Sequence, residues 1–483
     1  MARKFSEIFG IGLDQPQLDF VDITPDVDTP LFIDPFAISL KEDEWSVSCH
    51  VHITHFFRTA LDHIRAGRHD DAKRMLNGLS EPNETCLGLS RGTPSGRGVS
   101  GKQAIDLYAS LAKSQAAKTG LLEELADCDL FVEGIGTDKL SDITTNIIRR
   151  LLIDYTQAQC ALHGLVLSGT LPTGRFWDME RASWRSDYAE LPVVDNKRII
   201  LVPKYSVRRG LCLNHQEYYS HHVLNFIQQE EFERGSSLVR VLKSGERRPP
   251  FKKTLEEKFP FSKDFLAQFS EQHPEVLSRY KELYRNLPGA RGTLSHDDFE
   301  DDFDEAVFAR ALAEHLKRIP TGNDDASAYH KFIVGALEFI LWPNLIYPKK
   351  ESEIHEGRKR IDITYTNAAK GGFFYRAHTA FKIASNYVMA ECKNYSKDPA
   401  NPEIDQLSGR FSANRGWLGL LLYRDVSDHD LLMRRCRDTA QDGRGFILPI
   451  GDTQIVEFLE LIAEGARGAI DQRLEATLQR LTG

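Results

Sequence analysis

The stretch NYVMAECKN, residues 386–394, decides how the C-terminal third of the chain folds. Its uninterrupted apolar run, residues 388–390, is typical of a buried strand. Glu391 and Lys393 follow two positions apart, and side chains with that spacing project from the same face of a strand. The stretch therefore predicts a central strand that presents a carboxylate and an ammonium group side by side.

A second strand is predicted in RKRIDITYT, residues 358–366, where apolar and polar residues alternate. Asp362 faces the side of this strand that is opposite to its two isoleucine neighbours. If the two strands belong to one sheet, Asp362, Glu391 and Lys393 can converge on a single point.

Four further segments surround these two strands and complete a regular order of helix, three strands, helix and strand. They are a helix at residues 326–342, a strand at 344–350, a helix at 402–411 and a strand at 417–423. The periodicity therefore predicts an αβββαβ unit.

The element order, Asp362 and the Glu391-Cys392-Lys393 motif together resemble the core of the PD-(D/E)XK nucleases, the restriction-endonuclease-like superfamily, over roughly 100 of the 483 residues. The resemblance implies an α/β domain with a mixed central sheet and a site that uses Mg²⁺ or Mn²⁺. Carboxylate oxygens of Asp362 and Glu391 suit such hard cations. By analogy with the family, the backbone carbonyl of Cys392 supplies a further ligand.

The resemblance also assigns roles to five side chains. Lys393 would orient the attacking water or stabilise the transition state, while the metal polarises the phosphate and lowers the pKa of that water. Glu338, near the end of the first helix, matches an additional acidic residue at the metal site. Gln406 would position groups in the active site, and Arg410 and Arg415 would contact phosphate.

A purely structural role is the alternative for these carboxylates. Asp362 and Glu391 could be strand residues that are ion-paired to Lys393 and Arg360. The spacing Glu-x-Lys alone occurs by chance about twice in a chain of this length, so the conjunction of motif and element order carries the interpretation. Between Asp362 and Glu391 lie 28 residues, and this insert is either a substrate loop or a surface excursion.

The remainder of the chain resembles no family that we can name from its motifs. We expect a mainly helical recognition or regulatory domain at residues 1–190 and a mixed, helix-rich middle region at 191–320. The nuclease domain would span residues 326–450, after a linker rich in Pro, Gly and Asp, and a C-terminal helix would span 451–483.

Charge is distributed unevenly along the chain. Residues 330–425 contain 14 Lys and Arg against 10 Asp and Glu, a balance of +4, so the net charge of −9 leaves −13 for the rest. The basic excess therefore coincides with the nuclease motif. A second basic run could be a solvated loop or could guide nucleic acid. It consists of Lys243, Arg247, Arg248, Lys252 and Lys253, with Phe251 among them.

The cysteines and the hydropathy of the chain indicate in which cellular compartment the protein is expected. The seven cysteines are scattered and never form a Cys-x-x-Cys pair, which argues against a disulfide framework or structural zinc. The N-terminal stretch makes a poor signal peptide, and no apolar run reaches 18 residues. We therefore expect a cytoplasmic protein without a membrane partner.

The resemblance implies metal-dependent hydrolysis of phosphodiester bonds, with DNA the favoured substrate, in prokaryotic anti-phage or restriction-type defence. Three alternatives remain: a binding module that no longer cuts, a structure-specific or transposition-related nuclease, and an RNase. Because cutting both strands with one-site domains usually needs two active sites, we expect a homodimer. An activating partner protein is a further hypothesis.

Overall fold

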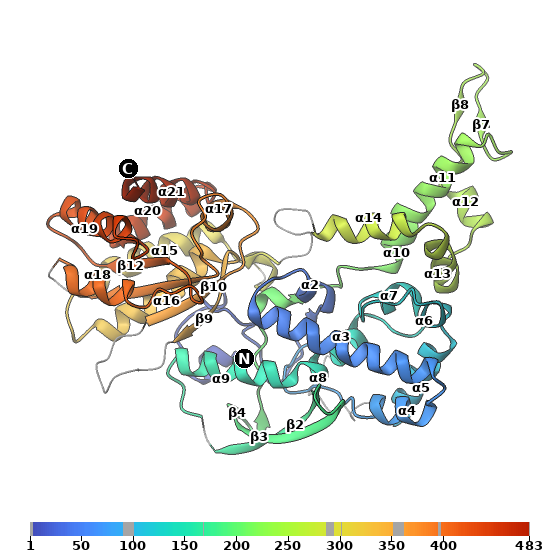
Figure 1. Ribbon diagram of the computed structural model, residues 1–483, viewed down its shortest axis with the longest axis horizontal. Coiled ribbons are helices and arrows are strands. Elements are labelled where there is room, and N and C mark those ends of the chain that lie inside the picture. The colour runs from blue at the N-terminus through green and yellow to red at the C-terminus, as the bar shows by residue number, and fades with distance from the viewer. Residues whose placement is uncertain are drawn as a thin grey trace.

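The computed structural model describes residues 3–89, 101–167, 169–285, 294–300, 302–350, 362–394 and 398–482 (Figure 1). For residues 101–103 and for Asp362 it describes the backbone alone. Buried apolar side chains in these segments form two cores. We call residues 3–294 the N-terminal unit and residues 305–482 the C-terminal unit. No helix in the described segments is long and apolar enough to cross a membrane.

The body of the N-terminal unit is mainly helical. Its helices are α1 (Phe5–Ile8), η1 (Gln15–Gln17), α2 (Pro35–Ser39), α3 (Glu44–Arg65), α4 (His69–Leu76), α5 (Gly101–Lys113), α6 (Gln115–Thr119), α7 (Asp127–Phe131), α8 (Thr137–Ile147), α9 (Arg149–Leu162) and η2 (Lys204–Ser206). Its strands form three antiparallel pairs: β1 (Phe32–Ile33) with β6 (Val207–Arg208), β2 (Thr170–Asp178) with β3 (Ser183–Glu190), and β4 (Val193–Val194) with β5 (Lys197–Arg198).

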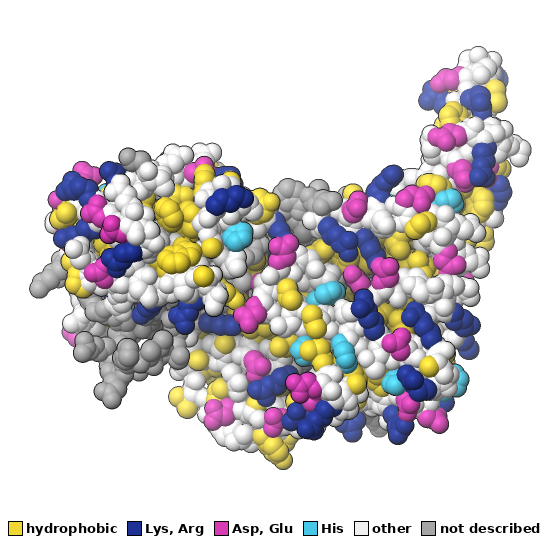
Figure 2. Space-filling model, viewed as in Figure 1, with side chains coloured by type: hydrophobic (Ala, Val, Ile, Leu, Met, Phe, Trp, Pro, Cys, Tyr) yellow, Lys and Arg dark blue, Asp and Glu magenta, His cyan; other side chains and the backbone are white. Residues whose placement is uncertain are grey.

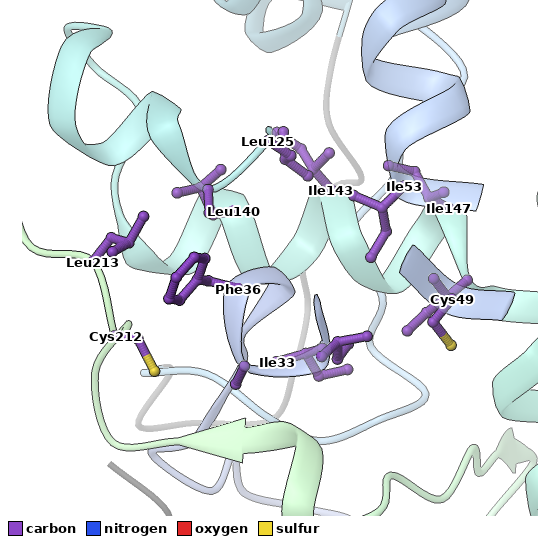
Figure 3. Close-up of a cluster of buried hydrophobic side chains, with 14 of the residues drawn as sticks. Ile33, Phe36, Cys49, Ile53, Leu125, Leu140, Ile143, Ile147, Cys212 and Leu213 are labelled. Atoms are coloured by element: carbon purple, nitrogen blue, oxygen red, sulfur yellow. The ribbon is translucent and has the colours of Figure 1, made fainter. Parts of the chain in front are cut away.

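The expected domain boundary at residue 190 is not a boundary between cores. β6 pairs with β1, and Leu213 lies in one buried cluster with Ile33 and Phe36 (Figure 3). Strand pairing and shared burial therefore join residues 191–214 to the N-terminal unit.

A slender projection extends from the rest of the N-terminal unit (Figure 1). Its base consists of α10 (His215–Glu217), η3 (Tyr218–Val223), α13 (Lys263–Gln272) and α14 (Pro274–Arg285), and α13 packs against α6 and α7 of the helical body. Its outer part consists of α11 (Leu224–Glu233), β7 (Arg240–Val241), β8 (Arg247–Arg248) and α12 (Lys252–Lys258). β7 and β8 form an antiparallel ribbon at its outer end. The short helix η4 (His296–Asp298) follows and leads toward the C-terminal unit.

The C-terminal unit contains a five-stranded mixed sheet in the order β13-β12-β11-β10-β9. The β9–β10 and β10–β11 pairs are antiparallel, and the β11–β12 and β12–β13 pairs are parallel. The elements in chain order are α15 (Glu305–Arg318), α16 (Ala326–Leu341), β9 (Leu345–Lys350), β10 (Asp362–Asn367), α17 (Gly372–Thr379), β11 (Tyr387–Lys393), α18 (Asn401–Ser408), β12 (Leu418–Tyr423), α19 (His429–Gln441), β13 (Phe446–Gly451), α20 (Asp452–Ala463) and α21 (Ala469–Thr482). The expected α/β class and element order are present, with α17 added in the insert.

This unit is larger than the expected nuclease domain at both ends. α15, which we expected in the middle region, packs against α20. Where we expected one C-terminal helix, the described residues form two, α20 and α21, and both pack against β13. The apolar faces of α15, α20 and α21 are buried in the C-terminal core, so these helices are parts of one unit with the sheet.

Helix α18 covers the face of the sheet that carries Glu391. A Cβ at Gly419 of β12 would lie 2.8 Å from Phe411 Cζ and 3.2 Å from Leu407 Cδ2, so α18 and the residues after it cover the face of Gly419. The parallel register pairs Met389 with Gly419 and Glu391 with Leu421, which puts Glu391 on this same face. α18 can approach so closely because residue 419 has no side chain.

The N-terminal unit covers β9, which is an edge strand of the sheet. Ile346 and Tyr347 of β9 are buried in the N-terminal core. The backbone N–H of Tyr347 donates to Asp19 Oδ1 at 3.0 Å, and Gln159 Nε2 donates to the carbonyl of Pro348 at 3.1 Å. The two units are therefore joined along this strand.

Candidate active site

Strand pairing brings two of the predicted acidic positions together. In the antiparallel register of β10 and β11, Asp362 lies directly opposite Glu391. Residues in such positions project from the same face of a sheet, with Cβ atoms about 4.5–5.5 Å apart. The side chain of Asp362 lies outside the part of the chain that the structure describes.

Glu391 and Lys393 form an ion pair on the face covered by α18. Lys393 Nζ donates to Glu391 Oε1, and each of the two side chains is 1% exposed. Arg410 Nη1 lies 3.5 Å from Glu391 Oε2. A buried carboxylate is thus balanced by two cations, and charge interactions between buried groups are stronger than those at the surface.

The helix α18 and the residues after it supply the remaining predicted groups. Gln406 lies on α18 and is half-buried, and Arg410 lies two residues beyond the last residue of the helix. Arg415 is exposed in the loop before β12, where its backbone N–H donates to the carbonyl of Ser412 at 3.1 Å. Arg410 is the member of this set that the structure pairs with Glu391.

The backbone carbonyl of Cys392 lies 3.1 Å from His330 Nε2. His330 is a buried residue of α16, so this contact ties the helix to the strand that carries Glu391 and Lys393. A carbonyl oxygen has two lone pairs, and a hydrogen bond from the Nε2 tautomer would use one of them. The sequence analysis did not find His330, although an imidazole within a mostly apolar helix was a signal for a buried polar partner.

Glu338 does not belong to this group of residues. Its carboxylate lies 3.4 Å from Lys204 Nζ of the N-terminal unit, and both side chains are buried. Burial raises the pKa of Glu338 to about 8, with Lys204 opposing the shift and Asp19 adding to it. Burial and the charge of Glu338 raise the pKa of Tyr365, whose side chain faces the side of β10 opposite to Asp362. The expected metal-site role of Glu338 is therefore replaced by a contact between the two units.

The strand register puts two residues with carboxyl side chains, Asp362 and Glu391, opposite each other. Two carboxylates on adjacent strands offer hard oxygen ligands, and a buried counter-ion balances one of them. Among side chains that the structure describes, no group of three His, Cys, Asp or Glu residues is arranged to hold a metal ion, and Asp362 is outside that search. The residues fit such an ion through the pair Asp362 and Glu391.

Comparison with known proteins gives limited matches. Residues 10–214 match a family model described as "Domain of unknown function (DUF8370)". This match ends where the first part of the N-terminal unit ends, just before α10. No solved structure matches the chain.

A curated protein of Escherichia coli (strain K12), "Putative transposon gamma-delta 80.3 kDa protein", is 27% identical over 117 residues. The match covers 24% of this chain and 16% of that protein's length. The chain therefore shares only a segment with this relative.

Proposed function

We propose that the chain is a metal-dependent nuclease and that its C-terminal sheet is a restriction-endonuclease-like core. The pairing of Asp362 opposite Glu391, with Lys393 on the same face, is the observation that carries the proposal. These three residues occupy neighbouring positions on one face of the sheet, and their types are those needed for phosphodiester hydrolysis. The helix order around the sheet agrees with that fold.

Each residue has a defined task in the proposed reaction. Asp362 and Glu391 would hold Mg²⁺ or Mn²⁺, which supplies Lewis-acid activation of the phosphate and of the attacking water. Lys393 would orient that water and balance charge on the phosphate in the transition state. Arg410 lies next to Glu391 and would bind the phosphate whose charge Lys393 balances. Gln406, on α18, would position the substrate.

The proposed substrate is nucleic acid, with DNA favoured and a role in prokaryotic defence. A transposition-related nuclease is the second candidate, because the E. coli relative carries a transposon protein's name. We further propose a cytoplasmic homodimer, since two active sites would cut both strands. Control by an activating partner protein through the N-terminal unit is part of the same proposal.

The test is cleavage of supercoiled plasmid, linear duplex, branched DNA, single-stranded DNA and RNA by the full chain with Mg²⁺ or Mn²⁺. Asp362→Asn, Glu391→Gln and Lys393→Met should each abolish cutting, and a chelator should do the same. Selective cutting of branched or transposon-end substrates would favour the transposition-related candidate.

Lys317→Met serves as a control because Lys317 is exposed and paired with Glu314 on α15. It should cut as the wild type does, and a thermal melt of every variant separates lost chemistry from lost folding. Folded variants of Asp362 and Lys393 that still cut would refute the assigned site.

A further inference from the structure

The outer part of the projection, residues 234–258, is a strongly basic segment that we call the basic arm. It contains α12, the β7–β8 ribbon and the connections between them, and it extends away from the rest of the molecule (Figure 1). Eight of its residues are Lys or Arg and three are Glu, a balance of +5 in a chain of net charge −9. Figure 2 shows Lys and Arg side chains distributed along this projection.

Most of the cations on the basic arm are not matched by carboxylates. Arg234, Arg248 and Lys258 form ion pairs with glutamates. For the other five cations, no carboxylate of the described residues lies within 4 Å. These are Arg240, Lys243, Arg247, Lys252 and Lys253. An exposed excess of positive charge on an acidic protein fits a polyanion.

Two of these arginines are held in place by aromatic rings. Arg240 Cζ lies 3.7 Å from the centre of the Phe251 ring, and Arg240 Nε donates to the carbonyl of Pro249 at 2.8 Å. Arg247 Cζ lies 5.4 Å from the centre of the Phe232 ring. A guanidinium that is already oriented loses less conformational freedom when it binds a phosphate or a base edge.

Two apolar side chains of the basic arm are largely exposed, one on the ribbon and one at the start of α12. Val241 is 68% exposed and Phe251 is 58% exposed. The major groove of B-form DNA admits a two-stranded ribbon, where apolar groups can contact thymine methyl groups. A-form RNA has a deep, narrow major groove that side chains cannot read, so the shape of the basic arm favours duplex DNA.

We propose that the basic arm binds duplex DNA, with its ribbon in the major groove and its lysines on the flanking phosphates. The proposal extends the proposed nuclease function by naming how substrate is held, but DNA binding by the arm does not require cleavage. The basic arm and the C-terminal unit lie toward opposite ends of the long axis of the molecule (Figure 1). A duplex that reaches both must therefore be long.

The experiment measures fluorescence anisotropy of labelled duplexes of about 12 and about 40 base pairs with the full chain and EDTA. The test variant is Lys243→Gln/Arg247→Gln/Lys253→Gln. The control variant, Lys73→Gln/Arg74→Gln/Lys118→Gln, removes the same charge from exposed positions on α4 and α6. For the long DNA, the test variant should lose at least about tenfold in affinity, and its salt slope should fall by about 2, one unit for each lysine that contacts a phosphate.

Equal affinity and salt slope for the test and control variants would overturn the proposal and leave the arm as a solvated loop or a protein contact. If the test variant lost as much affinity for a long RNA duplex as for DNA, the proposed placement of the ribbon in the major groove would be wrong. The two proposals fail separately: folded variants of Asp362 and Lys393 that still cut would refute the assigned nuclease site alone, whereas normal binding by the arm variant would refute this one alone.

Discussion

At the scale of single residues, period-two spacing was enough to predict that Glu391 and Lys393 lie together, because a strand fixes which neighbours share a face. The pairing of Asp362 opposite Glu391 also followed from two strands in one sheet. Glu338 differs because its partner, Lys204, is remote in sequence and comes from another unit. Position on a helix does not reveal such a partner.

Asp142 on α8 illustrates a carboxyl group whose titration opposes folding. Burial, aided by the charges of Asp138, Glu81 and Asp28, raises the pKa of Asp142 to about 8. The folded protein therefore keeps a proton that the unfolded chain releases, so stability falls as pH rises from about 4 to about 8. Asp142→Asn should raise the free energy of unfolding on the order of 2 kcal/mol at pH 8.

Urea unfolding at pH 8 and pH 4.5 measures this effect. The gain in unfolding free energy from Asp142→Asn should be smaller at pH 4.5 than at pH 8. At the lower pH, the folded wild type and the folded variant both carry a neutral side chain at position 142. Asp106→Asn, on the exposed face of α5, is the control and should change stability little at either pH. A pH-independent gain would rule out titration as the cause.

At the scale of secondary-structure elements, the order of helices and strands in the C-terminal unit could be predicted from periodicity. The α17 helix in the insert was not predicted, because its short pattern is anchored by a distant partner. The backbone N–H of Phe373 donates to Asp471 Oδ1 at 2.7 Å, and Phe373 is buried. The insert is thus packed against α21 at this point, and a substrate role for its remaining residues stays a prediction.

The close approach of α18 to β12 makes Gly419 a sensitive position for the proposed site. In Gly419→Ala, the new methyl group would press on Phe411 and Leu407, at a cost of about 1–3 kcal/mol. Because α18 precedes Arg410, the shift should move Arg410 away from Glu391. We expect cleavage to fall at least about tenfold, measured at a temperature where the variant remains folded.

A smaller side chain at position 411 should relieve that crowding. Gly419→Ala/Phe411→Leu is therefore expected to recover part of the lost activity, even though Phe411→Leu alone opens a gap beside Gly419. Cleavage by Gly419→Ala at the wild-type rate would show that the position of α18 does not control the site.

At the scale of the whole molecule, the division into two cores could not be read from the linker composition. The linker at residues 320–325 lies inside the C-terminal unit, because α15 before it packs against α20 after the sheet. Long-range packing of this kind leaves no local mark in the sequence. The pairing of β1 with β6 could not be predicted for the same reason, because the two strands are far apart in the sequence.

The buried pair of Lys204 and Glu338 links the two units and should be energetically important as a pair. Burial raises the pKa of Glu338 to about 8, and Lys204→Met would remove the cation that opposes this shift, which should cost about 3 kcal/mol of stability at pH 9. Adding Glu338→Gln should return much of that loss at pH 9, since both partners are then neutral. Urea unfolding of the single variants and the double variant measures the coupling between them.

A coupling energy near zero would mean that the pair does not hold the units together. Lys281→Met is a comparison from within the N-terminal unit, because Lys281 is buried against Asp127 at 2.6 Å. It should destabilise the protein without any rescue by Glu338→Gln.

The cover that the N-terminal unit places over β9 has a consequence for solubility. A fragment containing only the sheet and its helices would expose Ile346, Tyr347 and a row of unpaired backbone groups along β9. Exposed edge strands of this kind pair with other chains and promote aggregation. The N-terminal unit thus shields this edge of the sheet from pairing with other chains.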